Sequence, residues 1–122
     1  MRSTIIIGHG HFASGLVSAL EMISGKQKRL YALDWTEDMS PYVLKERFKH
    51  LIKKTIGKSE SVFVFVDMEG ATPYQVAKTY VEESPWTSRI HVKANVNLPM
   101  LMKYMYLPSQ LKDTEILEEL AV

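Results

Sequence analysis

Short apolar runs alternate with longer amphipathic stretches along the 122-residue chain. Four runs, at residues 5–7, 30–33, 61–66 and 89–92, indicate β-strands. The third is β-branched or aromatic on both faces, which is typical of a strand at the centre of a sheet. Between the runs, apolar residues recur every three or four positions, which is the spacing of one helix face. The pattern therefore predicts strands and helices in alternation.

Residues that begin or end helices stand at the borders of the amphipathic stretches. The first stretch covers residues 12–24, and Gly25 is placed to end it. The second begins at Ser40, whose hydroxyl can cap a helix, and continues with Pro41, a favoured residue of the first turn. Gly57 closes that second helix.

Strands that are joined by helices through short connections form a parallel sheet with right-handed crossovers. We therefore expect an α/β fold with a doubly wound, mainly parallel sheet of about four strands and helices on both faces, in one domain over residues 1–122. The carboxyl ends of such strands meet at one edge, where ligands bind. His9 and Asp67 should lie there, with Asp34 and Asn97 as candidates of second rank.

The first apolar run stops at a turn in which Gly8 and Gly10 flank His9. Glycines allow a sharp turn and a close approach of the backbone to a bound group. The helix that follows would direct free N–H groups and its positive dipole end toward the same place, which favours anions. The pattern suggests a histidine that meets a phosphate. The alternatives are a metal pair with His11, whose side chain should diverge from that of His9, and a solvated loop histidine.

The composition narrows the functional classes. A formal net charge of +1, with basic and acidic residues mixed throughout, argues against a dedicated nucleic-acid or anionic-membrane surface. The absence of cysteine excludes disulfides and thiol catalysis. The chain begins without a signal peptide, so we expect a cytoplasmic protein. Neither glycine-rich nucleotide motif is complete, because Gly8-x-Gly10 is followed by Ala13 and residues 57–59 follow a helix. We expect no metal and no cofactor.

Three segments resemble the enzyme IIA components of the mannose-type bacterial sugar phosphotransferase system. They are the segment around the first turn, the end of the third strand with its following turn, and an asparagine-rich loop with the helix after it: residues 6–16, 64–73 and 95–101. In order and spacing they cover most of the chain. The resemblance implies a phosphohistidine carrier for sugar uptake that takes a phosphoryl group from the phosphocarrier protein HPr and passes it to an enzyme IIB partner. Membrane IIC and IID components would be indirect partners.

The resemblance also implies roles for individual residues. His9 would carry the phosphate, Asp67 would orient its ring, and Thr72 would help to hold the phosphate, besides serving as the cap of the third helix with Pro73 as the first helical residue. An unperturbed histidine titrates near about pH 6.5, so a neutral ring can act as the nucleophile at cytoplasmic pH. Backbone N–H groups around Gly10 and at the Thr72 helix start would stabilise the phosphate without a metal.

The chain departs from the family pattern at several positions. Gly8 stands where the family usually has Ser or Thr, Ala71 stands where a second glycine is usual, and Gln75 replaces an asparagine. Asn95 occupies a position where glycine is common. The chain also stops at Val122, short of the segment through which some members exchange a strand. These differences bear on the groups around the phosphate, on the type of dimer and on the choice of partner.

Two other functions remain open. The chain is also similar to a related phosphocarrier that feeds dihydroxyacetone kinase. A different class is a regulatory binding module, in which a partner reads the phosphorylation state of His9. Two further histidines, His50 among lysines on a helix and His91 inside a strand, are expected to be structural.

The Met- and Tyr-rich segment 100–107 is apolar on more than one helical face. We expect much of this surface to be buried in a homodimer, by surface contact more than by strand exchange because little chain is left before Val122. The alternative is that a final helix, residues 111–120, folds back over the segment within one chain.

Overall fold

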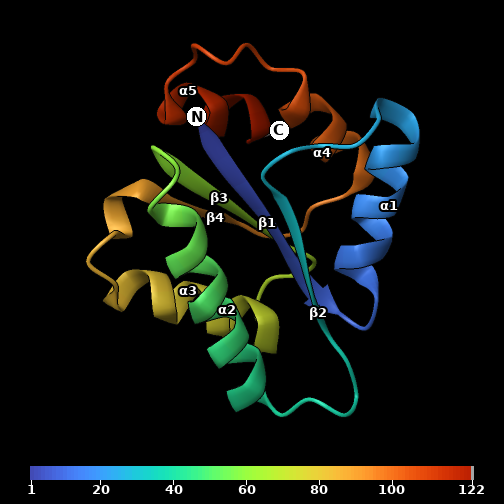
Figure 1. Ribbon diagram of the computed structural model, residues 1–122, viewed down its shortest axis with the longest axis vertical. Helices are drawn as coiled ribbons and strands as arrows, with labels where there is room; N and C mark the ends of the chain where they lie inside the picture. Colours follow the sequence, from blue (N-terminus) through green and yellow to red (C-terminus); the bar gives the residue numbers. More distant parts are fainter. Residues whose placement is uncertain (122) are drawn as a thin grey trace.

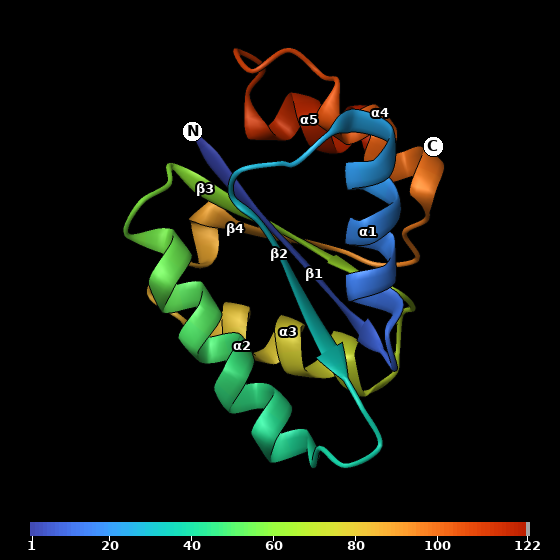
Figure 2. The same ribbon diagram turned by 45° about the vertical axis from the view of Figure 1, so that its right-hand side comes forward.

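The computed structural model describes residues 1–121, in which a parallel four-stranded sheet lies between two layers of helices (Figures 1 and 2). The strands are β1 (Arg2–His9), β2 (Leu30–Trp35), β3 (Ser61–Val66) and β4 (Ile90–Lys93). The helices are α1 (Phe12–Ser24), α2 (Pro41–Ile56), α3 (Thr72–Glu83), α4 (Leu98–Met105) and α5 (Asp113–Leu120), with a 3-10 turn, η1 (Thr87–Arg89). The predicted α/β fold is confirmed.

The order of the strands in the sheet places the candidate site. The order is β2-β1-β3-β4, and all three pairs are parallel. The chain moves outward to β2 from β1, then crosses to β3 on the other side of β1. Open α/β sheets bind ligands at the carboxyl ends of the strands where the order reverses in this way. The ends of β1 and β3, which carry His9 and the residue before Asp67, meet at that point.

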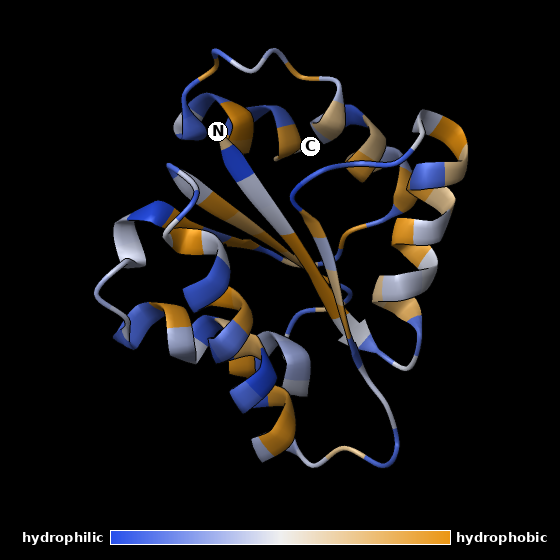
Figure 3. Cartoon of the chain, viewed as in Figure 1, coloured by the Kyte–Doolittle hydropathy of each residue, from blue (hydrophilic) through white to orange (hydrophobic). Residues whose placement is uncertain are grey.

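The core is divided by the sheet into two hydrophobic clusters. Alternate side chains of β1 and β3 point to opposite faces, as the period of two requires. Ile5, Ile7, Val62, Val64 and Val66 pack against α2 and α3, whereas Ile6, Phe63 and Phe65 pack against α1, α4 and α5. Figure 3 shows the resulting apolar centre of the sheet between helices with polar outer faces. Burial on both faces explains why the third strand is apolar throughout.

The helix borders follow the predictions with one correction. α1 ends at Gly25, which has a positive φ of 79°, and the Ser40 hydroxyl accepts the Val43 N–H at 3.2 Å as the cap of α2. The prediction that Thr72 caps α3 is wrong, because Ala71 is the cap residue and Thr72 is already helical. Proline lacks an N–H and fits anywhere in the first turn, where that N–H has no helical partner, so Pro73 did not fix the border.

The Met- and Tyr-rich segment forms α4, and α5 folds back against it. Leu101 is fully buried in the cluster that contains Ile116 and Leu120 of α5, and most other apolar side chains of α4 are partly buried around them. Tyr106, which follows α4 in the same segment, is 68% exposed. The alternative expectation for this segment therefore describes the chain better, and the homodimer stays a prediction. Val122, on which the expectation about strand exchange depends, lies outside the described residues.

No helix in residues 1–121 combines the length and the apolar character that crossing a membrane requires.

Candidate functional site

The two strand ends at the centre of the sheet bring His9 and Asp67 into direct contact. His9 is the last residue of β1, and Asp67 follows β3, the neighbouring parallel strand. The ring Nδ1 of His9 lies 2.7 Å from Oδ2 of Asp67, and the backbone N–H of His9 donates to the same oxygen at 2.8 Å. The other carboxylate oxygen accepts the N–H of Met68 at 2.8 Å. Asp67 is thus fixed on both oxygens and holds the imidazole.

The unequal exposure of the pair determines which atom can react. The side chain of Asp67 is 12% exposed, whereas that of His9 is 43% exposed. When the Nδ1–H is donated to the carboxylate, the lone pair of the neutral ring is on Nε2, on the far side of the ring. His9 lines a cavity of about 450 Å³ together with Gly10, Trp35 and Glu37. The arrangement presents a nucleophilic nitrogen next to an open space.

Trp35 is a neighbour of His9 that the sequence analysis missed. It is the last residue of β2, in register with His9, and the two ring centroids lie 5.5 Å apart at an interplanar angle of 58°. Its indole N–H donates to the Met39 carbonyl at 2.8 Å, which fixes the ring. The sequence pattern ended this strand at Leu33 and so left Trp35 outside it. Extending the predicted strand by two residues, from Leu33 to Trp35, would have placed this aromatic residue opposite His9.

Gly8 is required by the close approach of Asp67. A Cβ atom at position 8 would lie 2.9 Å from Cγ of Asp67 and 2.9 Å from Cδ2 of Phe12, closer than real Cβ contacts. The position is therefore sterically restricted to glycine in this arrangement. The absence of a hydroxyl side chain before His9 follows from the same packing that brings Asp67 to the ring.

The predicted phosphate-binding residues differ in what the structure leaves them to do. Gly10 has a φ of 55°, as the sharp turn requires, but its N–H donates to the Trp35 carbonyl at 2.8 Å. The N–H of Gly10 itself is therefore occupied, and phosphate binding by the N–H groups around Gly10 stays a prediction. Thr72 is half-buried at the first position of α3, and its side chain is not used as the helix cap. The first-turn N–H groups of α1 and α3 have no partners within their own helices.

Asp34 lies beside the first turn of α1 and bonds to it. Its carboxylate accepts the Ser14 N–H at 2.9 Å and the Ser14 hydroxyl at 2.5 Å, and it lies 3.2 Å from Nδ1 of the exposed His11. Partial burial alone would raise the pKa of Asp34, but the hydrogen bonds from Ser14 and the nearby His11 outweigh it and hold the pKa below its usual value. Asp34 braces the helix that follows His9.

The two asparagines of the fourth loop also support the site through the backbone. Asn97 is the cap of α4 and accepts the Met100 N–H at 2.9 Å, which accounts for this candidate of second rank. Asn95 has a φ of 59°, a conformation that asparagine tolerates better than most residues, and its side chain accepts the Glu69 N–H at 3.0 Å. Asn95 thereby holds the turn that carries Asp67.

The alternative that His9 and His11 bind one metal ion together can be compared with the contacts of the two rings. His9 and His11 bond to different carboxylates, those of Asp67 and Asp34. Across residues 1–121, no three His, Asp or Glu side chains gather in a group that could hold a metal ion. A third histidine–aspartate pair, His91 and Asp113, lies at the opposite edge of the sheet with Nε2 and Oδ2 2.9 Å apart.

Comparisons with known proteins agree on one family. A family sequence model described as the PTS system fructose IIA component, where PTS is the phosphotransferase system, matches residues 3–121. The fructose-specific EIIA component of Bacillus subtilis is 32% identical over 120 residues, which cover 98% of this chain and 80% of that protein. The mannose-specific EIIAB component of Escherichia coli is 29% identical over 104 residues, and the match covers 84% of this chain but 31% of that protein.

Solved structures share the same fold. The EIIA component of Streptococcus agalactiae superposes with a TM-score of 0.87 at 24% identity, covering 99% of this chain and 90% of that one. The mannose/sorbose-specific IIA subunit of Enterococcus faecalis gives a TM-score of 0.84 at 22% identity, covering 98% of this chain and 86% of that one. At these identities the likeness concerns the fold alone.

Proposed function

Because the chain belongs to the family of phosphotransferase-system fructose IIA components, we propose that it accepts a phosphoryl group from phospho-HPr on His9 and passes it to an enzyme IIB partner. The membership itself implies phosphoryl transfer in sugar uptake. The donor, the acceptor and the acceptor atom are the proposed part. As such a carrier it would act in the cytoplasm, where its donor and acceptor meet it.

The observation that carries this proposal is the 2.7 Å contact between Nδ1 of His9 and the carboxylate of Asp67. The lone pair of Nε2 attacks phosphorus, the new N–P bond forms, and the bond from phosphorus to the donor atom breaks. The ring gains positive character in this step because Nδ1 keeps its proton. The carboxylate of Asp67 stabilises that charge and fixes the tautomer, as an orienting carboxylate does for other reactive histidines. Transfer to the acceptor reverses the step.

Phosphoryl transfer depends mainly on alignment and on stabilisation of charge on the phosphate oxygens. Apart from the Ser14 N–H, which donates to Asp34, the N–H groups in the first turns of α1 and α3 are suited to this task, because helix N-termini bind anions. We propose that the Thr72 hydroxyl adds a donor, which is consistent with its not serving as the helix cap. The open space over Gly10, where no atom beyond Gly10 and its two chain neighbours lies within 4 Å of an added Cβ, leaves room for the phosphoryl group.

The similar proteins named above support a role in transport over the two alternatives. The descriptions of the two relatives found by sequence refer to fructose and mannose components of the phosphotransferase system. We therefore propose a transport component and leave the sugar open.

Phosphorylation in a defined mixture tests the proposal. The protein is incubated with phosphoenolpyruvate, enzyme I and HPr, and intact-mass analysis should find one acid-labile, alkali-stable phosphoryl group. The variant His9→Ala should not gain it, whereas His91→Ala, which removes the ring of the pair with Asp113, should be labelled normally. Label on His9→Ala would refute the assignment of the acceptor. Failure of the unmodified protein to gain label would refute the proposed donor.

A further inference from the structure

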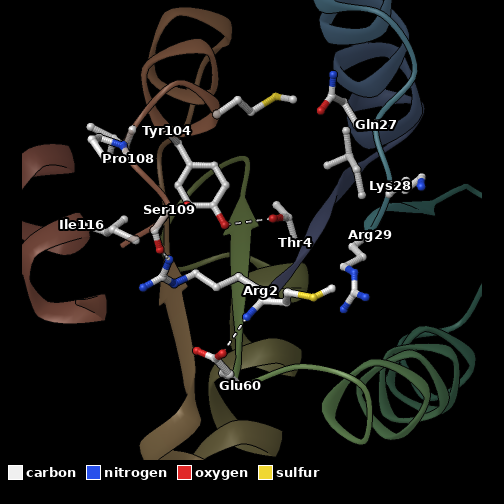
Figure 4. A pocket seen from close by; sticks show the side chains of 14 residues that line it. Arg2, Thr4, Gln27, Lys28, Arg29, Glu60, Tyr104, Pro108, Ser109 and Ile116 are labelled. Carbon is white, nitrogen blue, oxygen red and sulfur yellow. Dashed lines mark hydrogen bonds and ion pairs between the residues drawn. The ribbon is translucent and has the colours of Figure 1, made fainter. Parts of the chain in front are cut away.

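A second cavity, of about 390 Å³, opens at the amino-terminal edge of the sheet, opposite to His9 (Figure 4). Lys28 and Arg29, from the loop before β2, form one side. Tyr104 and Pro108, together with Ile116 of α5, form the other side. The volume falls within the range of about 300–1,000 Å³ that is usual for small-molecule sites. This cavity has no part in the phosphoryl transfer described above.

The charged residues around the cavity leave a positive excess on one side. Arg2 also lines the cavity, but its guanidinium is paired with Asp113 at 2.7 Å. Glu60 is paired with the amino group of Met1 at 2.8 Å. Within residues 1–121, no carboxylate lies within 4 Å of the side-chain nitrogens of Lys28 or Arg29. Two cations thus border the cavity without a compensating acidic side chain, which suits an anionic ligand.

The backbone of Arg29 indicates that its side chain serves a purpose beyond the turn. Its φ of 61° lies in the left-handed region, which glycine adopts without strain and which arginine rarely adopts. The Thr4 N–H donates to the Arg29 carbonyl at 2.8 Å and fixes this conformation. The guanidinium donates one hydrogen bond, to the Lys58 carbonyl at 2.9 Å. Because a guanidinium has five N–H donors, others remain for a ligand.

The opposite side of the cavity carries an apolar surface beside two polar side chains, those of Arg2 and Ser109. Leu107 and Pro108 line it, and the Tyr104 hydroxyl is already bonded to the Thr4 hydroxyl at 2.9 Å, which leaves the ring as the contact surface. A ligand that fills this space would place an anionic group on Lys28 and Arg29 and an apolar body against these residues. We propose that the cavity binds a small organic anion with a phosphate or carboxylate group and an apolar body.

Chemical-shift titration of the ¹⁵N-labelled protein tests this proposal. The probes are phenyl phosphate, benzoate, inorganic phosphate and phenol. We expect saturable shifts of amides in residues 27–30 and 104–109 with phenyl phosphate or benzoate, and weaker binding of inorganic phosphate and phenol, each of which offers half of the required chemistry. The better of the two anionic probes identifies the preferred headgroup. The proposal is overturned if neither gives a saturable shift there up to about 10 mM, the weak end of small-ligand affinity.

Variants separate the proposed contacts from general effects of charge. Lys28→Ala should weaken the tighter anionic probe by about fivefold or more, because a charge-assisted contact is lost. Arg29→Asn should do the same, since asparagine tolerates a positive φ but carries no charge. Lys26→Ala is the matched control, because Lys26 is exposed in the same loop but does not line the cavity. Equal affinities in Lys28→Ala, Lys26→Ala and the unmodified protein would overturn the proposal. This test holds even if Arg29→Asn disturbs the fold by losing the hydrogen bond to the Lys58 carbonyl.

Discussion

Among the histidine–aspartate pairs, His9–Asp67 and His91–Asp113 lie at opposite edges of the same sheet, and of these two only the first has the surroundings of a reactive site. In the pair at the carboxyl edge, Nδ1 of His9 bonds to Asp67 at 2.7 Å and the histidine is 43% exposed. In the pair at the amino edge, Nε2 of His91 bonds to Asp113 at 2.9 Å and the histidine is 19% exposed. The two contacts are almost equal in length, so the difference between the pairs must come from what surrounds them.

The surroundings differ in the use of the carboxylate and in the space around the ring. Asp113 also accepts the Arg2 guanidinium at 2.7 Å and the Ser61 hydroxyl at 3.1 Å, and the ring of His91 packs 4.9 Å from that of Phe63. The negative charge of Asp113 is therefore shared with an arginine. The contacts of Asp113 join β1, β3 and β4 to α5. Within residues 1–121, no lysine or arginine pairs with Asp67, and its histidine borders a cavity. A short contact to a carboxylate alone does not make a histidine reactive.

Replacement of the two aspartates should break the comparison most strongly. Asp67→Asn should slow phosphorylation of His9 by about 10²- to 10⁴-fold, because an amide can fill the space but cannot stabilise the charge on the ring. Asp113→Asn should leave the rate for each folded molecule unchanged. Single-turnover transfer from phospho-HPr, scaled by the folded fraction from circular dichroism, measures both. Similar rates in the two variants would contradict the distinction that we draw.

Stability should show the reverse order. Asp113→Asn should lower the free energy of unfolding by about 1–3 kcal/mol near pH 7, because hydrogen bonds to a charged group from Arg2, His91 and Ser61 are weakened. Urea unfolding measures this change. Glu118→Gln, at an exposed position of the same helix, is the control and should have little effect.

The effect of Asp113→Asn should also depend on pH. Partial burial tends to raise the pKa of Asp113, but the hydrogen bonds from Arg2, His91 and Ser61 outweigh it and hold the pKa below its ordinary value of 3.8. A group whose pKa is lowered by folding contributes stability above its unfolded pKa and loses it as the pH falls through the folded value. The difference between the two proteins should therefore shrink below about pH 4. A difference that stays constant down to pH 2 would contradict the ionic origin.

The smallest expected effect concerns Trp35, whose ring lies beside that of His9. Trp35→Leu should hasten hydrolysis of phosphorylated His9 by about two- to tenfold, since an aromatic contact is worth about 0.5–1.5 kcal/mol. Trp35→Phe should restore most of the lifetime. The decay of the phosphorylated species is followed by intact mass after the donor has been removed. Equal lifetimes in all three proteins would show that the ring does not protect the phosphoryl group.

The sequence predicted the carboxyl edge better than the amino edge for a physical reason. His9 and Asp67 each follow an apolar strand, so parallel pairing alone brings them together. Arg2 and Asp113 are 111 residues apart and meet only because α5 docks under the sheet. Nothing in the local pattern states where a terminal helix will dock, because that depends on which apolar surface remains uncovered.

Details of the backbone were also beyond the pattern. The extension of β2 to Trp35 depends on pairing with β1, since Asp34 and Trp35 do not continue an apolar run. The left-handed conformation of Arg29 contradicts the preference of its side chain and is fixed by the contact with Thr4. Propensity governs such residues only when tertiary contacts do not override it. The sequence pattern therefore missed Trp35 beside His9 and the conformation of Arg29 at the second cavity.

The single carboxylate oxygen that accepts both the backbone N–H and the ring N–H of His9 has a kinetic consequence. Because the same oxygen binds the ring and the backbone of His9, the imidazole keeps one orientation for both the donor and the acceptor protein. A phosphoryl group on Nε2 would leave in the direction from which it came. Donor and acceptor must then occupy the same place in turn, which excludes a ternary complex. On the proposed function, the carrier should therefore obey ping-pong kinetics.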